Sequence, residues 1–124
     1  MLAASAVATT LPAQDLDRAQ RFYSEKLGLD PVETMREAAS LRYEVADCAF
    51  VLFTSAGEPS GTHTQMGFMV DDVESEVATL RDRGVVFEEG PGVDQTDGIV
   101  TLGSGRGAWF KDSEGNLLSV FQEG

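Results

Sequence analysis

The stretch AQDLDRAQRFYSEKLGLDP, residues 13–31, has the pattern of an amphipathic helix with a marked beginning and end. Its apolar residues recur at spacings of three and four, which places them on one side of a helix. They are Leu16, Ala19, Phe22, Tyr23 and Leu27. Asp15 is a suitable N-cap, Gly28 offers a left-handed C-cap, and Pro31 prevents continuation. The pattern predicts a helix over about 16–27.

Strand patterns flank this helix on both sides. SAVATTL, residues 5–11, is rich in small and β-branched residues, and PVETMRE, SLRYEVA and CAFVLFT follow the helix. SLRYEVA alternates apolar with polar residues, and its Arg42 and Glu44 share one face, where an ion pair is possible. CAFVLFT is almost wholly apolar, which predicts a central strand covered on both faces.

The same order of elements then occurs a second time. TQMGFMV reads as a strand, and DDVESEVATLRDRG reads as a helix with Asp71 or Asp72 as its N-cap and Gly84 as its stop. After it come VVFEE, a glycine-rich loop through 90–98, AWFKD, a DSEGN turn and LLSVFQ. The sequence therefore contains an internal repeat in which a strand, a helix and further strands follow one another in the same order.

The two halves are expected to form one domain over residues 1–124. Module one covers about 1–56, a linker rich in Gly, Pro and Ser covers about 55–61, and module two covers about 62–124. Each half has about 60 residues, a size at which burial is marginal, so the halves should share an interface. A repeat of this kind places a cavity between its copies.

Composition and charge exclude several classes of function. The formal net charge of −12 repels nucleic acid and anionic membrane surfaces, so neither is an expected partner. No apolar run approaches the roughly 18 residues of a membrane span. The apolar first twelve residues resemble a signal peptide, but no Lys or Arg precedes Arg18, and we interpret them as a strand. The chain has a single cysteine, Cys48, so it cannot form an intramolecular disulfide, which is consistent with the cytoplasm. We expect Cys48 to be a small buried apolar residue.

The chain resembles the vicinal oxygen chelate superfamily, which includes glyoxalase I, bleomycin resistance proteins and extradiol dioxygenases. DLDRAQRFYSEKLGLDPV (15–32), MGFMVDDVESEVATLRDRGVVFEE (66–89) and WFKDSEGNLLSVFQ (109–122) carry the resemblance. It implies an α+β fold in which two βαβββ modules form a cup-shaped mixed β-sheet with the helices outside. It also implies a ligand inside the cup and a homodimer.

The resemblance also shows which positions hold metal ligands in metal-using relatives, and this chain lacks them. These positions carry Ala8, Gln65 and Ser119, with Val51 as the best match for the fourth. Strand periodicity places Gln65 on one face together with His63, Gly67 and Met69. One amide oxygen does not meet the demand of a catalytic metal site for about three protein ligands. We therefore expect no metal, no cofactor and no catalytic residue of the family's usual kind.

The leading hypothesis is a metal-free protein that binds a small apolar or aromatic molecule in its cup. Hydrogen bonds would come from three polar residues and apolar contacts from four aromatic ones. The expected ligand-binding residues are Thr10, Tyr43, Phe53, Gln65, Trp109, Ser119 and Phe121. Strand parity alone does not choose which of the aromatic residues face inward.

An enzyme of the same superfamily is the alternative. It would be a metal-dependent lyase or dioxygenase with displaced ligands, or a metal-free isomerase in which Tyr43 or His63 moves a proton. The glycine-rich GSGRG at 103–107 lacks the Lys-Ser/Thr and the helix of a phosphate-binding loop, so it is expected to form a hinge or a hairpin loop. Arg106 within it could close over an anionic group.

Overall fold

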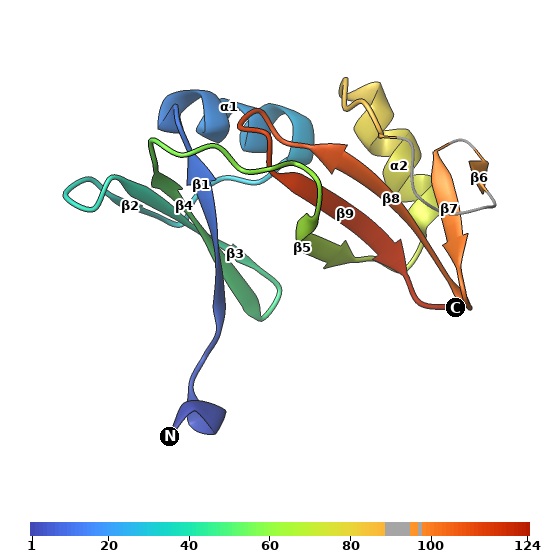
Figure 1. Ribbon diagram of the computed structural model, residues 1–124, viewed down its shortest axis with the longest axis horizontal. Coiled ribbons are helices and arrows are strands. Elements are labelled where there is room, and N and C mark those ends of the chain that lie inside the picture. The colour runs from blue at the N-terminus through green and yellow to red at the C-terminus, as the bar shows by residue number, and fades with distance from the viewer. Residues whose placement is uncertain (89–94, 97) are drawn as a thin grey trace.

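The computed structural model describes residues 1–88, 95–96 and 98–124, which form two α-helices and two β-sheets (Figure 1). The elements of the first half are η1 (Leu2–Ala4, a 3-10 helix), β1 (Ala8–Ala13), α1 (Leu16–Leu27), β2 (Glu33–Met35), β3 (Ser40–Val45) and β4 (Cys48–Thr54). The elements of the second half are β5 (Thr64–Met69), α2 (Val73–Asp82), β6 (Gln95–Thr96), β7 (Ile99–Leu102), β8 (Gly105–Lys111) and β9 (Leu117–Gln122).

Each half forms its own sheet, and the second sheet repeats the strand order of the first with one further strand, β6, at its edge. The first sheet has the order β1-β4-β3-β2, and the second has the order β5-β9-β8-β7-β6. In each sheet the first strand lies parallel beside the last strand of its module, and the other neighbours are antiparallel. This confirms the predicted α+β fold of two βαβββ modules. The apolar strand β4 lies centrally, as its composition predicted, but the prediction that both of its faces are covered is wrong. Phe50 and Leu52 face the helix and are buried, whereas Val51 and Phe53 on the opposite face are only half-buried.

Local capping signals set the ends of both helices. Asp15 accepts a hydrogen bond from the Arg18 backbone N–H at 3.0 Å, and Gly28 ends α1 with a φ of +70°. Asp72, rather than Asp71, caps α2 by accepting from the Ser75 N–H at 3.2 Å. The helix predicted over 16–27 is confirmed. No helix in the described part of the chain is long and apolar enough to cross a membrane.

Each helix covers one face of the sheet in its own module. In module one, Tyr23 of α1 lies against the rings of Tyr43 and Phe50, with its ring centroid 5.6 Å from each of theirs. The rings of Tyr43 and Phe50 are themselves stacked, 4.7 Å apart. The buried residues that module two contributes to the common core include Val73, Val77, Leu80, Ala108, Phe110, Leu118 and Val120. The other face of each sheet carries no helix, and we call it the open face.

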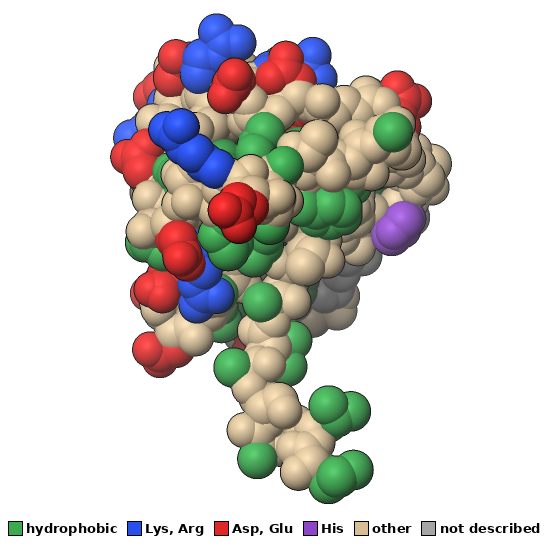
Figure 2. Space-filling view, turned by 90° about the vertical axis from the view of Figure 1, so that its left-hand side faces the viewer, with side chains coloured by type: hydrophobic (Ala, Val, Ile, Leu, Met, Phe, Trp, Pro, Cys, Tyr) green, Lys and Arg blue, Asp and Glu red, His purple; other side chains and the backbone are tan. Residues whose placement is uncertain are grey.

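The start of the chain differs from its sequence interpretation. The first strand begins at Ala8 and not at residue 5, and residues 1–7 form an arm that projects from the body (Figures 1 and 2). Met1, Leu2 and Val7 on this arm are exposed. In VVFEE, Phe87 forms only an isolated bridge with Phe110. Most of the predicted loop at 90–98 lies outside the described residues.

The DSEGN turn joins the second module to the first helix. The carboxylate of Asp112 accepts a 2.7 Å hydrogen bond from the Tyr23 hydroxyl, and Asn116 donates to the carbonyl oxygen of Pro12 at 3.0 Å. Glu114 accepts from the guanidinium of Arg18 at 2.8 and 3.0 Å. Asp112, Glu114 and Asn116 are all buried, so they replace their water contacts with contacts across the module boundary.

The two helix-stop glycines make a second junction between the modules. A Cβ atom at Gly28 would lie 2.7 Å from Nη1 of Arg83, and one at Gly84 would lie 2.9 Å from Nζ of Lys26. Each module thus places a cation over the glycine that ends the helix of the other. Cations are favourable beside helix C-termini because of the exposed carbonyl groups there. Equivalent positions of the two modules therefore make equivalent contacts, as expected for an internal repeat.

Tyr23→Phe is expected to lower the free energy of unfolding by about 2 kcal/mol, because it removes one hydrogen bond to the charged, buried carboxylate of Asp112. Burial and the Asp112 carboxylate both hold the pKa of Tyr23 well above its usual range, so the hydroxyl remains a donor. Urea denaturation at neutral pH measures the loss.

Tyr43→Phe is the matched control, since the Tyr43 hydroxyl is buried and has no hydrogen-bond partner among the described residues. Its removal is expected to be neutral or stabilising. Equal losses from the two variants would contradict the assigned importance of the hydrogen bond to Asp112.

Candidate functional site

The open face of module one is shaped by β1, β4 and β3. Thr10 and Val51 are register partners, and Arg42 on β3 lies beside Val51. Because Leu11 and Leu52 are buried against the helix, strand alternation places Thr10 and Phe53 on the open face. This face presents an apolar floor with a hydroxyl group at one edge.

A surface ion pair borders this floor. The Arg42 guanidinium lies 3.6 Å from the carboxylate of Glu44 on the same strand, as their shared face predicted. Both side chains are more than a third exposed, so the pair contributes little to stability. Its effect is to place charge at the rim and leave the centre of the face apolar.

The open face of module two is richer in aromatic side chains. Ser119 of β9 lies between Trp109 on β8 and Gly67 on β5 in the strand register. The indole Nε1–H of Trp109 donates to the Thr64 hydroxyl at 2.8 Å, which fixes the orientation of the ring. The absence of a side chain at Gly67 leaves room for the Ser119 hydroxyl, which would lie 2.7 Å from a Cβ atom there.

Phe121 lies over a floor of two glycines. A Cβ atom at Gly105 would come within 2.3 Å of Cζ of Phe121, and one at Gly107 within 3.1 Å of its Cδ1. The ring therefore occupies the space that side chains on β8 would otherwise fill. With Trp109 next to Gly107, this arrangement gives an aromatic surface that remains partly exposed.

Gln65 lies at an irregularity in β5. Thr64 pairs with Leu117 and Met66 pairs with Leu118, so Gln65 is an additional residue that interrupts the alternation. The predicted face of His63, Gln65, Gly67 and Met69 is wrong at its start because of this bulge: Thr64 replaces His63 in the series. His63 is exposed and lies within hydrogen-bond distance, 3.1 Å, of the Ser60 hydroxyl.

The side-chain oxygen of Gln65 lacks a hydrogen-bond donor among the described residues. Its Oε1 atom is buried and has no hydrogen-bond partner among the described residues. A buried acceptor without a donor costs about 1–3 kcal/mol. A ligand that brings an N–H or O–H group to this oxygen would remove that cost.

Tyr43, one of the expected ligand-binding residues, does not lie in the site. Tyr43 is 1% exposed and lies in the core, on the face of its sheet that α1 covers. Burial, and then the negative charge of Asp30, raise the pKa of Tyr43 to about 12. Of the other expected residues, two lie on the open face of module one, three on that of module two, and Gln65 at the bulge between strand partners.

Several contributors to this site were missing from the sequence interpretation. Thr64 anchors Trp109, and Gly105 and Gly107 make room for Phe121. The signal was present as glycines at a spacing of two in a strand, which leaves one strand face bare. The sequence did not show that Phe121, on the neighbouring strand β9, fills the space over these glycines.

The site residues do not fit a metal ion. Of the four positions at which metal-using relatives carry ligands, Ala8 and Val51 have no donor atom, and Gln65 and Ser119 offer one amide and one hydroxyl. Within residues 1–88, 95–96 and 98–124, no three His, Cys, Asp or Glu side chains are grouped in a way that could hold a metal.

Comparison with known proteins agrees with this geometry. A family model described as Glyoxalase/Bleomycin resistance protein/Dioxygenase superfamily matches residues 5–120. No curated protein matches the sequence.

Three solved structures are similar over nearly the whole chain. TnmS3, an antibiotic binding protein from Streptomyces sp. CB03234, is 26% identical, with a TM-score of 0.77 and coverage of 100% of this chain and 99% of its own. UcmS2 is 25% identical, with a TM-score of 0.75 and coverage of 95% and 97%. A glyoxalase/bleomycin resistance protein from the same Streptomyces is 27% identical, with a TM-score of 0.69 and coverage of 94% and 98%.

Proposed function

Because the chain belongs to the glyoxalase/bleomycin resistance protein/dioxygenase superfamily, we propose that it binds a small aromatic molecule without a metal, on the open faces of its two sheets. The observation that carries this proposal is the ring of Phe121 lying over Gly105 and Gly107, beside an indole that Thr64 holds in place. A surface of this kind suits a flat apolar ligand. The antibiotic-binding description of TnmS3 supports the same class of function.

The polar groups suggest what else the ligand carries. The unpartnered Oε1 of Gln65 is an acceptor, and a hydroxyl or amino group on the ligand would satisfy it. Ser119 and Thr10 add hydroxyl groups that donate or accept. The proposed ligand is therefore planar and apolar, with at least one hydrogen-bond donor at its edge.

A second copy of the chain is proposed to close the site. The two open faces belong to separate sheets, and no strand of one pairs with a strand of the other in the described part of the chain. Met69 on the open face of module two is 62% exposed, and the arm exposes Leu2 and Val7. Apolar surface of this kind favours association. Sedimentation equilibrium should give twice the 13.3 kDa of one chain, and a 13.3 kDa species at micromolar concentration would contradict the dimer.

The binding proposal is tested by a pair of ligands that share a carbon skeleton. Isothermal titration calorimetry with 2-naphthol is expected to show saturable binding, at least about tenfold tighter than with decahydro-2-naphthol, which cannot lie flat on an aromatic ring. Binding should also change the fluorescence of Trp109, the only tryptophan in the chain. Equal affinity for both compounds would show that burial alone, and not the aromatic surface, selects the ligand.

A further inference from the structure

We propose that the arm of one chain, residues 1–7, closes over the open face of module two in a second copy, where Leu2 and Val7 form a roof over the ligand site. The proposal rests on the ligand-binding function and the dimer proposed above. Small-molecule sites cover about 70–90% of the surface of their ligand, whereas a flat molecule on one face of a sheet is covered on one side only. The proposed site therefore needs a second wall.

The arm has apolar side chains that its own chain leaves uncovered. All seven of its residues are exposed, and Leu2 and Val7 are 84% and 86% exposed. Backbone hydrogen bonds to the carbonyl oxygens of Met1 and Leu2, at 3.1 and 2.9 Å, hold η1 together within the arm. Apolar side chains that project into water gain free energy from any surface that covers them.

The arm also carries no charged side chain. No Asp, Glu, Lys or Arg precedes Asp15, although the chain as a whole has a net charge of −12. Figure 2 shows hydrophobic side chains and no charged ones on the projecting arm. Two copies with this net charge repel each other over most of their surfaces, so contact is favoured where both surfaces are uncharged.

The open face of module two offers such a surface. Trp109, Ser119 and Phe121 are uncharged, and both rings are partly exposed. Met69 on the same face is 62% exposed. Leu2 of the arm would bury apolar area against these rings or against a flat ligand that lies on them.

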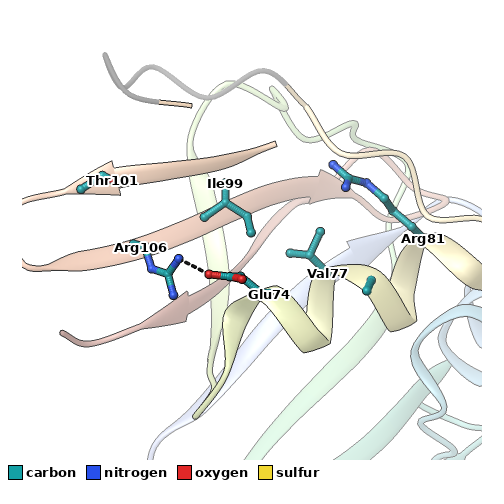
Figure 3. Close-up of a pocket in the computed structure, with 7 residues that line it drawn as sticks. Glu74, Val77, Arg81, Ile99, Thr101 and Arg106 are labelled. Carbon is teal, nitrogen blue, oxygen red and sulfur yellow. Dashed lines mark hydrogen bonds and ion pairs between the residues drawn. The ribbon is translucent and has the colours of Figure 1, made fainter. Parts of the chain in front are cut away.

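The hollow on the helix side of the same sheet is a poorer partner for the arm. It has a volume of about 390 Å³ and lies between α2 and β7 (Figure 3). Val77 and Ile99 line it with apolar side chains, but Arg106 and Glu74 form an ion pair at its rim (Figure 3). An uncharged arm would remove water from both charged groups without offering a charge in return, which costs free energy. The aromatic surface of the open face imposes no such cost.

The direction of the arm favours a second copy over its own chain. Ala8 is in register with Ala49 at the start of β4, and the arm continues β1 beyond the β3–β4 hairpin, away from both helices (Figure 1). To cover module two of its own chain, the arm would have to turn back at Ala8. With η1 intact it reaches about 20 Å from Ala8, compared with about 15 Å across β5, β9, β8 and β7. The arm is therefore long enough to span this face in a second copy.

The test detects contact between two copies directly. Cys48, which is exposed and not buried as expected, is replaced by serine, and Ser5→Cys then places a nitroxide spin label on the arm. This spin-labelled chain is mixed in equal amounts with a parent chain that carries nitrogen-15 and no nitroxide. The nitroxide is expected to broaden the indole N–H signal of Trp109 in the parent chain, and reduction of the nitroxide with ascorbate should restore the signal.

Substitution of the apolar residues of the arm should abolish this contact. Leu2→Ser combined with Val7→Ser is expected to remove the broadening and to raise the dissociation constant of the dimer at least about tenfold, because two apolar side chains per arm are no longer buried. Val32→Ser combined with Val86→Ser is the matched control. These valines are 57% and 79% exposed and belong neither to the arm nor to the aromatic surface, so their replacement should leave both measurements unchanged.

The roof should also strengthen ligand binding. The parent chain is expected to bind 2-naphthol at least about tenfold more tightly than the Leu2→Ser, Val7→Ser variant, because the variant covers only one side of the ligand. Calorimetry at a concentration where both proteins are dimeric makes the comparison independent of the oligomeric state. Equal affinities would contradict the roof.

Two further results would overturn the proposal. One is a mixed sample without broadening although sedimentation shows a dimer. The other is broadening only when the nitroxide and nitrogen-15 are on the same chain, diluted with an excess of unlabelled parent, since the arm then covers its own module. A parent chain that fails to bind 2-naphthol but shows the broadening would count against the ligand-binding function and support the arm contact, so the two proposals fail separately.

Discussion

Replacing Glu114 with glutamine is expected to lower the free energy of unfolding by about 3 kcal/mol at pH 7, the largest single effect on stability that the structure predicts. The Glu114 side chain is 0% exposed. It accepts hydrogen bonds from Arg18, from the Asp15 backbone N–H and from Ser113 at 2.8–3.0 Å. A glutamine amide cannot accept from the guanidinium at both of its positions.

The effect should depend on pH in a defined direction. Burial acts to raise the pKa of Glu114, but the hydrogen bonds from Arg18, Asp15 and Ser113 outweigh it and lower the pKa from an ordinary 4.5 to about 2. A carboxyl group with a lowered folded-state pKa stabilises the fold fully above its unfolded pKa, and the stabilisation is lost as the pH falls through the folded one. The difference between the parent and Glu114→Gln should therefore shrink between pH 4.5 and pH 2.

Urea denaturation of both proteins across this range measures the difference. Glu37→Gln is the control, because it makes the same change in net charge at an exposed position. It should alter stability by less than about 0.5 kcal/mol. A difference for Glu114→Gln that stays constant down to pH 2.5 would mean that shape, and not charge, accounts for the loss.

Gly105→Ala is expected to weaken 2-naphthol at least about tenfold, or about 1.4 kcal/mol in binding free energy. The new Cβ atom would meet Cζ of Phe121 at 2.3 Å and the Gln122 carbonyl oxygen at 3.0 Å. Because the Phe121 ring is partly exposed, it can swing aside, so the fold should survive while the aromatic surface is lost. Calorimetry measures the affinity, and thermal unfolding checks the fold.

Two further variants make this result specific. Gly57→Ala, where a Cβ atom would meet only the Ser55 hydroxyl at 3.7 Å, should bind like the parent. Phe121→Ala should lose as much affinity as Gly105→Ala, and the double variant should lose little more, since both changes remove the same ring contact. Additive losses would show that Gly105 acts in some way other than by making room for Phe121.

The helices were predictable because their signals are local. The stripe from Leu16 to Leu27, the Asp15 cap and the Gly28 stop act over a few residues along the chain, and the structure follows them closely. The central place of β4 was also predictable, because a strand of almost continuous apolar residues is stable only between neighbours.

The composition of the candidate site was only partly predictable. Thr10, Phe53, Trp109, Ser119 and Phe121 lie on open faces, but Tyr43 lies in the core. Alternation shows that Tyr43 and Arg42 face opposite ways and does not show which of the two faces the helix. That choice depends on which side of the sheet α1 packs against, and this is decided by contacts between residues far apart in the sequence.

Sequence alone determined the repeat, the helix ends, the division into two βαβββ modules through the family resemblance, and the absence of the usual metal-ligand side chains. Tertiary structure alone decided that a bulge at Gln65 replaces His63 by Thr64 on the open face, and that Phe121 fills the space over Gly105. The first set rests on the types and spacing of neighbouring residues. The second set rests on how strands and helices are packed side by side, where a shift of one residue or the position of one ring changes which atoms meet.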